Sequence, residues 1–166
     1  EMQRSLVGSE MCIRDRSESV AEIKTGNPVT DVILTQKQKE AEEKGIDFRC
    51  KFMYPTDTGI NAFDVSVILN NAITNAFEGV NGCKNPYVSV SAYRKKNAYM
   101  LELTNCVCKS VEIDDETGVP ETTKKDKGSH GFGLANIRKV AQKYYGDIDI
   151  SQDENSFTLT VMLMVE

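Results

Sequence analysis

The sequence has a single histidine, no CxxC pair and no long apolar run, and each shortage excludes a class of protein. No apolar stretch approaches the roughly 18 residues that a membrane-spanning helix needs, so we expect no membrane contact by this domain. His130 and five scattered cysteines cannot complete a Cys/His zinc site of ordinary spacing. An odd number of unpaired cysteines instead favours reduced thiols and a cytoplasmic location.

The sequence also lacks an excess of basic residues. It has 20 Lys and Arg against 25 Asp and Glu, which gives a formal net charge of -5. A field of this sign repels nucleic acid and anionic lipid, so we expect no nucleic-acid partner, and any bound phosphate must be held locally. The 166 residues, of which 40% are hydrophobic, are sufficient for the core of one domain.

The first sixteen residues differ from the rest of the chain. Residues 1–16 show neither helical nor strand periodicity and look like a translated library-adapter remnant, so we expect a disordered tail outside the fold. Residues 17–166 are expected to form the domain. Removing residues 1–16 leaves the net charge unchanged, because the segment contains three basic and three acidic residues.

The first half of the domain predicts two helices and one strand. Asn27 is a good helix N-cap and Pro28 fits the first helical position, so we predict a helix from there to about Lys44. Residues 46–53 alternate between apolar and polar, as a strand covered on one face does. Residues 61–79 are predicted to form a helix packed on a sheet through apolar residues at three- and four-residue steps: Phe63, Val67, Ile68, Ala72, Ile73, Ala76 and Phe77.

The second half predicts two hairpins around a further helix. Residues 87–95 and 98–106 alternate on either side of a tight turn, which indicates an antiparallel hairpin. A long polar segment, 109–129, is typical of a lid, and a helix is predicted over 134–145. Strands 147–151 and 157–165 close the chain. This order predicts an α/β fold, a two-layer α/β sandwich whose mixed, mainly antiparallel sheet is covered on one face by helices.

Two asparagines on the 61–79 helix are the first candidates for a binding site. Asn71 and Asn75 are four residues apart, so both amides leave the same helix face within one turn. The alternative is that they only hydrogen-bond neighbouring backbone, as polar residues on half-buried helices often do. Both lie next to the face expected to be buried, where an unsatisfied amide would cost on the order of 1–3 kcal/mol.

A glycine-rich segment and a strand end are the other two candidates. The segment Gly128-Ser129-His130-Gly131-Phe132-Gly133 opens a helix, and the free N–H groups of a helix start favour an anion, so it could hold a phosphate. It is neither a Rossmann fingerprint, since no strand directly precedes it, nor a P-loop, since it lacks GK[ST]. The strand 98–106 has an amide near its end, Asn105, which could bind a ligand or simply begin a turn.

Taken in order, these segments resemble the ATP-binding domain of sensor histidine kinases, a branch of the GHKL superfamily that has the Bergerat fold. LNNAITNAFEG is similar to the N-box of that family, TNC stands where its G1 box begins, and GSHGFGLANIRKVAQKYYG is similar to its G2 box. The opening TDVILTQKQKEAEEKGIDF resembles the start of the peptide-sensing receptor kinases. The resemblance covers residues 27–165.

The resemblance implies roles for individual residues. Asn75 would bind Mg²⁺, Asn71 would face the phosphates one turn earlier, and these two asparagines would be the catalytic residues. The residues implied to bind ATP are Asn71, Asn75, Asn105, Lys124, Gly128, His130, Gly131, Gly133 and Leu134. Asn105 stands where most of the superfamily has the Asp of DxGxG, so it would accept the adenine amino hydrogen bond without the assistance of a charge.

The function implied is that of a two-component histidine kinase domain. It would bind ATP and Mg²⁺ and transfer the γ-phosphoryl group to a histidine on an upstream dimerisation region, because His130 falls inside the G2-like segment. The implied partners are the phosphoacceptor helix of its own kinase and a response regulator, and the implied location is the cytoplasmic side of a membrane-anchored sensor. Two alternatives stay open: another GHKL protein, such as an anti-sigma-type Ser/Thr kinase, or a degenerate regulatory or dimerisation module.

Overall fold

The computed structural model of the chain describes residues 21–110, 112–114, 116, 118, 120 and 132–165. The predicted tail, 1–16, lies outside these residues, as do parts of the predicted lid. The described elements, in chain order, are α2 (Pro28–Glu43), β1 (Asp47–Lys51), α3 (Ala62–Gly79), β2 (Tyr87–Lys95), β3 (Ala98–Cys106), α4 (Phe132–Lys143), β4 (Asp147–Gln152) and β5 (Ser156–Met164).

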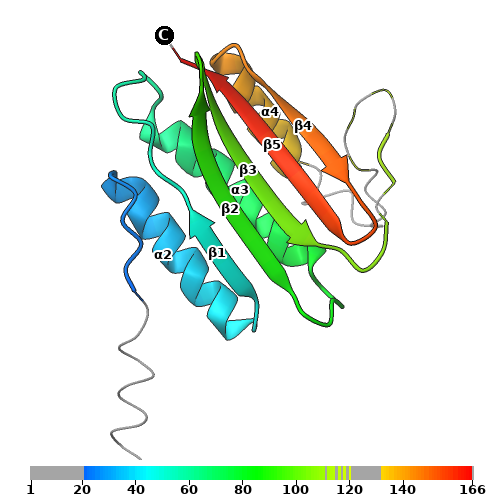
Figure 1. Ribbon diagram of the computed structural model, residues 1–166. Coiled ribbons are helices and arrows are strands. Elements are labelled where there is room, and N and C mark those ends of the chain that lie inside the picture. The colour runs from blue at the N-terminus through cyan, green and yellow to red at the C-terminus, as the bar shows by residue number, and fades with distance from the viewer. Residues whose placement is uncertain are drawn as a thin grey trace, which may run out of the picture.

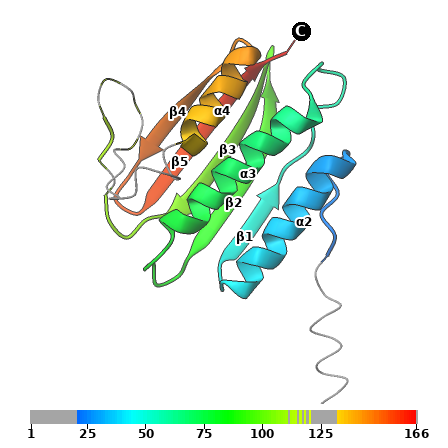
Figure 2. The ribbon, with the colours of Figure 1, turned by 180° about the vertical axis from the view of Figure 1, so that it is seen from behind.

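The strands of the described part form one sheet in the order β1-β2-β3-β5-β4. β1 pairs with β2 in parallel, and the remaining neighbours pair antiparallel. The helices α2, α3 and α4 all lie on the same face of this sheet, behind it in Figure 1 and in front of it in Figure 2. The prediction of a two-layer α/β sandwich with a mixed, mainly antiparallel sheet is therefore confirmed.

The helices α2 and α3 begin at side-chain caps that satisfy otherwise unpaired backbone N–H groups. The Asn27 side chain accepts a hydrogen bond from the N–H of Val29 at 2.9 Å, and Asn61 accepts one from Phe63 at 2.8 Å. The first cap was predicted from the Asn-Pro pair. Helix α4 begins at Phe132, two residues before the predicted start.

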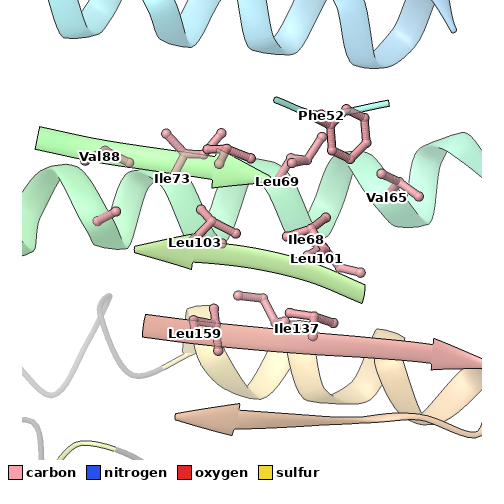
Figure 3. Packing of buried hydrophobic residues seen from close by; sticks show 14 of the residues in the cluster. Phe52, Val65, Ile68, Leu69, Ile73, Val88, Leu101, Leu103, Ile137 and Leu159 are labelled. Atoms are coloured by element: carbon pink, nitrogen blue, oxygen red, sulfur yellow. The ribbon is translucent and has the colours of Figure 1, made fainter. Parts of the chain in front are cut away.

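The core lies between α3 and the central strands. Leu101 and Leu103 project from β3 toward the helices, and Ile68 and Ile73 meet them from α3, all at 2% exposure or less. Figure 3 shows these side chains between the ribbon of α3 and the strands, with Ile137 joining them from α4. Because this cluster contacts every layer, it fixes the position of α3 on the sheet, and α3 carries the two candidate asparagines.

For two residues of α3, the prediction that their side chains are buried against the sheet is wrong. Phe63 is 69% exposed and Val67 is 39% exposed, whereas Val65 and Leu69 are fully buried. The reason is geometric: Val67 lies about 100° around the helix from Ile68, so it falls outside the arc that touches the sheet. The apolar residues of α3 cover more of its circumference than the buried arc does.

Gly146 is the glycine whose replacement we expect to cost most stability. A Cβ there would lie 1.7 Å from the Met162 carbonyl oxygen, a backbone atom of β5 that cannot move without disturbing the sheet. Gly146→Ala should therefore lower the free energy of unfolding by about 3 kcal/mol, measured by urea denaturation. Gly45→Ala is the control: its φ is +67° but nothing lies within 4 Å of the added Cβ, so only about 1 kcal/mol should be lost. Equal losses at both positions would contradict the clash.

Candidate functional site

The candidate site is built along one stripe of α3. Asn71, Asn75 and Gly79 follow one another at four-residue steps, so they lie on adjacent turns of the same helix face. Asn71 and Asn75 are both half-buried, whereas their neighbour Asn70 is exposed. Both amides therefore lie on one face of α3, as their spacing predicted.

The two asparagines differ in how their amides are bonded. The Nδ2 of Asn71 donates a hydrogen bond to the carbonyl oxygen of Val67 on its own helix at 2.8 Å, which is the backbone-bonding alternative considered for this residue. The side chain of Asn75 makes no hydrogen bond to any residue in the described part of the chain. A half-buried amide in this state retains its full capacity to bind a ligand. Of the two, Asn75 is the stronger candidate for the central ligand-binding group.

The first turn of α4 lies directly on Asn75. A Cβ built on Gly133 would come 3.0 Å from the Nδ2 of Asn75 and 3.2 Å from its Oδ1, so the absence of a side chain at Gly133 allows this close approach. Leu134, the next residue, is half-buried and packs against the core. The start of α4 and its free N–H groups are thereby brought to the Asn75 amide, although they are distant in sequence.

The position of α4 is fixed at its other end by an ion pair with α3. Asp64 accepts hydrogen bonds from the Nζ of Lys143 at 2.6 Å and from the Tyr144 hydroxyl at 2.5 Å. Burial opposes the ionisation of Asp64, but these two hydrogen bonds and the Lys143 charge outweigh it and lower the pKa of the carboxyl. Because the start of α3 is bonded to the end of α4, the two helices run antiparallel (Figure 2), and Gly133 falls opposite Asn75.

The third component is Asn105, near the end of β3. It continues the buried face of this strand and is only 4% exposed, between Val88 on β2 and Phe157 on β5 in the strand register. Its Nδ2 donates to the Cys106 carbonyl at 2.9 Å, and its Oδ1 forms no hydrogen bond with the described residues. The result is a single amide acceptor with an apolar side chain on either side.

Gly79 connects Asn105 to the α3 stripe. A Cβ on Gly79 would lie 2.9 Å from the Asn105 Nδ2, so only glycine allows the strand amide to reach the last turn of α3. Gly79 and Phe157 are not among the site residues predicted from the sequence. The signal that could have indicated Gly79 is its spacing, four residues after Asn75 on the same stripe.

The structure thus brings together Asn75 with Gly133, and Asn105 with Gly79, on consecutive turns of α3. Asn71 extends the same stripe by one turn. The other predicted ATP-binding residues, Lys124, Gly128, His130 and Gly131, lie outside the described residues. No group of three or more His, Cys, Asp or Glu side chains that could hold a metal ion occurs in the described residues, so a cation here would need amide and ligand oxygens.

A hollow elsewhere on the molecule does not coincide with these residues. It has a volume of about 490 Å³ and lies between residues 21–24, the Gln38 region of α2, and β1. β1 is the edge strand farthest from β4 in the sheet order. None of the predicted site residues lines it, so we do not assign it to the predicted chemistry. Among the described helices, none combines the length and apolar character required to span a bilayer.

Comparison with known proteins gives a family and a set of structural neighbours. The sequence model of the family described as the GHKL domain matches residues 60–164. A search of curated protein sequences found no match. The structure is similar to the catalytic domain of the histidine kinase ThkA in a nucleotide-free form, with a TM-score of 0.65 and 16% identity over 86% of this chain and 93% of that one.

Two further histidine kinases have the same fold. The Acinetobacter baumannii histidine kinase AdeS gives a TM-score of 0.61 at 14% identity, over 83% of this chain and 64% of that chain. The mycobacterial sensor histidine kinase MprB gives 0.58 at 14% identity, over 83% and 95% respectively. At such identities the likeness establishes a shared fold, which agrees with the fold implied by the sequence resemblance.

Proposed function

We propose that this chain, which belongs to the GHKL domain family, is the catalytic, ATP-binding domain of a sensor histidine kinase. It binds ATP with Mg²⁺ at the α3 stripe and transfers the γ-phosphoryl group to a histidine on a dimerisation helix of its own kinase. The phosphoryl group then passes to a response regulator. The kinase as a whole is proposed to be anchored in the membrane, with this domain on the cytoplasmic side.

The observation that carries the proposal is the state of Asn75. Its amide is half-buried, lies against the start of α4 and makes no hydrogen bond within the described residues. An accessible amide in this state has donors and an acceptor that a ligand can use. The free N–H groups of a helix start favour an anion next to it, which fits a phosphate.

The donor set fits a nucleotide-bound magnesium ion. Mg²⁺ prefers oxygen ligands and is usually held by few protein groups together with substrate phosphates and water. Asn75 offers its Oδ1 beside the start of α4, and Asn71 has an Oδ1 one turn away on the same stripe. Bound magnesium would neutralise charge on the transferring phosphoryl group. Asn75 would hold the magnesium ion, and Asn71 would face the phosphates.

Asn105 is suited to an adenine base. Its side chain is buried, its Oδ1 accepts no hydrogen bond from the described residues, and its Nδ2 is already held by the Cys106 carbonyl. The adenine amino group can donate to such an acceptor, and the apolar side chains of Val88 and Phe157 on either side favour a flat aromatic ring. Asn105 is uncharged, so it supplies a weaker hydrogen bond than an Asp would.

The asparagine at position 71 favours phosphoryl transfer over hydrolysis. Activating water requires a base, and an asparagine amide cannot take up a proton at neutral pH. Asn71 stands where hydrolysing members of the superfamily have a Glu, and its Nδ2 is bonded to the Val67 carbonyl. We therefore expect slow ATP turnover by the isolated chain.

Replacing Asn105 by Leu tests this proposal. The variant keeps the approximate volume but removes the acceptor, so affinity for ATP should fall about tenfold, the value of one hydrogen bond to a ligand. Isothermal titration calorimetry with ATP and with GTP gives an internal control, because guanine lacks the amino group that Asn105 is proposed to bind. The wild type should prefer ATP, and Asn105→Leu should lose that preference. An unchanged ATP affinity would contradict the assigned role of Asn105.

A further inference from the structure

Three of the five cysteines come together where α3 and β3 end. The Sγ of Cys108 donates to the Asn81 carbonyl at 3.5 Å and lies 3.5 Å from the Cβ position of Gly82. The Sγ of Cys106 accepts from the Tyr87 N–H at 3.4 Å and approaches the Asn85 carbonyl at 3.9 Å. Figure 2 shows the loop after α3 and the end of β3 at the same end of the sheet. Position 83 lies midway along the segment that both thiols contact.

Cys106 and Cys108 have different surroundings. Cys106 is buried, and its sulfur is already engaged both by the Tyr87 N–H and by the Asn85 carbonyl. Cys108 is exposed, and its Sγ donates to the Asn81 carbonyl. An oxidant dissolved in water can therefore reach Cys108 directly, whereas Cys106 is shielded.

Cys83 is half-buried and interacts with the thiols of both Cys106 and Cys108. Burial, followed by interactions with the thiols of Cys106 and Cys108, raises the pKa of Cys83 to about 12. Cys83 is less exposed than Cys108, so an oxidant meets Cys108 first. Its position beside an exposed cysteine suits it to react second.

We propose that Cys108 and Cys83 form a redox-active pair that hydrogen peroxide converts into a disulfide. The Cys108 thiolate attacks one peroxide oxygen, the O–O bond breaks, and the leaving hydroxide takes up the thiol's proton to become water. The Cys83 sulfur then attacks the Cys108 sulfenic acid, the S–O bond breaks, and the leaving hydroxide takes the Cys83 proton. Two thiols are oxidised, one peroxide is reduced, and two waters are formed.

The disulfide would join two segments adjacent to the candidate site. Cys108 follows Asn105 by three residues, and Cys83 follows Gly79 by four. Since Asn105 and Gly79 are in contact, the sulfurs extend an existing junction between β3 and α3. The pair does not depend on nucleotide binding, so its test is separate from that of the proposed function.

The experiment uses the full chain, reduced and then treated with one equivalent of hydrogen peroxide without nucleotide. Free thiols are then blocked with N-ethylmaleimide, and the tryptic peptides are identified by tandem mass spectrometry. Fragmentation at Val107 is needed because Cys106 and Cys108 lie on the same tryptic peptide. We expect the number of free thiols to fall from five to three, with a peptide in which residue 83 is linked to residue 108, and dithiothreitol should restore all five. Cys106→Ser should retain this linked peptide, and so should Cys50→Ser, whose half-buried thiol lies on β1.

Cys108→Ser provides the decisive variant, because substitutions at exposed positions change stability little. The linked peptide should disappear and Cys83 should be recovered fully alkylated. A linked peptide that persists in Cys108→Ser, a link between Cys83 and Cys106 in the wild type, or links formed only between molecules would each overturn the proposal.

Discussion

Replacing Asn75 by Ala is expected to abolish magnesium-dependent ATP binding, with at least about a 100-fold loss of affinity, or about 2.7 kcal/mol. The reason is that the Asn75 amide is proposed to be the protein ligand of the magnesium ion and lies against the start of α4. The fold should be retained, since this side chain forms no hydrogen bond with the described residues that its removal would break. Calorimetric titration with ATP, with and without Mg²⁺, measures the effect.

Asn70→Ala is the matched control for this prediction. Asn70 is the same residue type on the same helix, but it is exposed and lies off the stripe. Its affinity for ATP should equal that of the wild type, and both variants should have wild-type circular dichroism. If Asn75→Ala bound Mg·ATP as well as Asn70→Ala does, the assignment of the metal ligand would be wrong.

The second large effect concerns phosphoryl transfer. Incubated with γ-labelled ATP, the isolated chain should acquire no label, because its one histidine, His130, is expected to lie in the ATP-binding segment and not in line with the γ-phosphate. An added helical hairpin that carries the phosphoacceptor histidine of the same kinase should become labelled. The measurement is acid-labile, alkali-stable label on each polypeptide after electrophoresis.

Two variants make this result interpretable. Asn75→Ala should fail to label the added hairpin, which would tie the transfer to the α3 site. If the isolated wild type became labelled and His130→Ala did not, His130 would be the acceptor, and the chemistry assigned to this domain would be misplaced. A labelled hairpin together with an unlabelled catalytic chain agrees with the account.

Local signals explain which parts of the fold could be predicted. The Asn27 cap depends on the residues that follow it directly, and the β2–β3 hairpin on alternation around a short turn. The exposure of Phe63 could not be predicted in this way. Apolar character shows that a residue can be buried, but the arc of α3 that meets the sheet is decided by distant strands.

The candidate site follows the same division. The spacing of Asn71 and Asn75 along one helix was sufficient to place both amides on one face. The contact of Gly79 with Asn105 was not predictable, because it joins two elements separated by the whole of β2. Nor could spacing show that Asn71 bonds to its own helix while Asn75 lies against the start of α4, a segment distant in the sequence.

The most direct test of the central claim, that ATP binds along the α3 stripe, is a titration of the ¹⁵N-labelled chain with Mg·ATP, followed through the side-chain amide signals of its asparagines by nuclear magnetic resonance. We expect large shifts for Asn75 on α3 and for Asn105, which contacts Gly79 on the next turn of that helix, and little change for Asn70. Shifts confined to other asparagines, or Mg·ATP binding that leaves Asn75 and Asn105 unchanged, would contradict it.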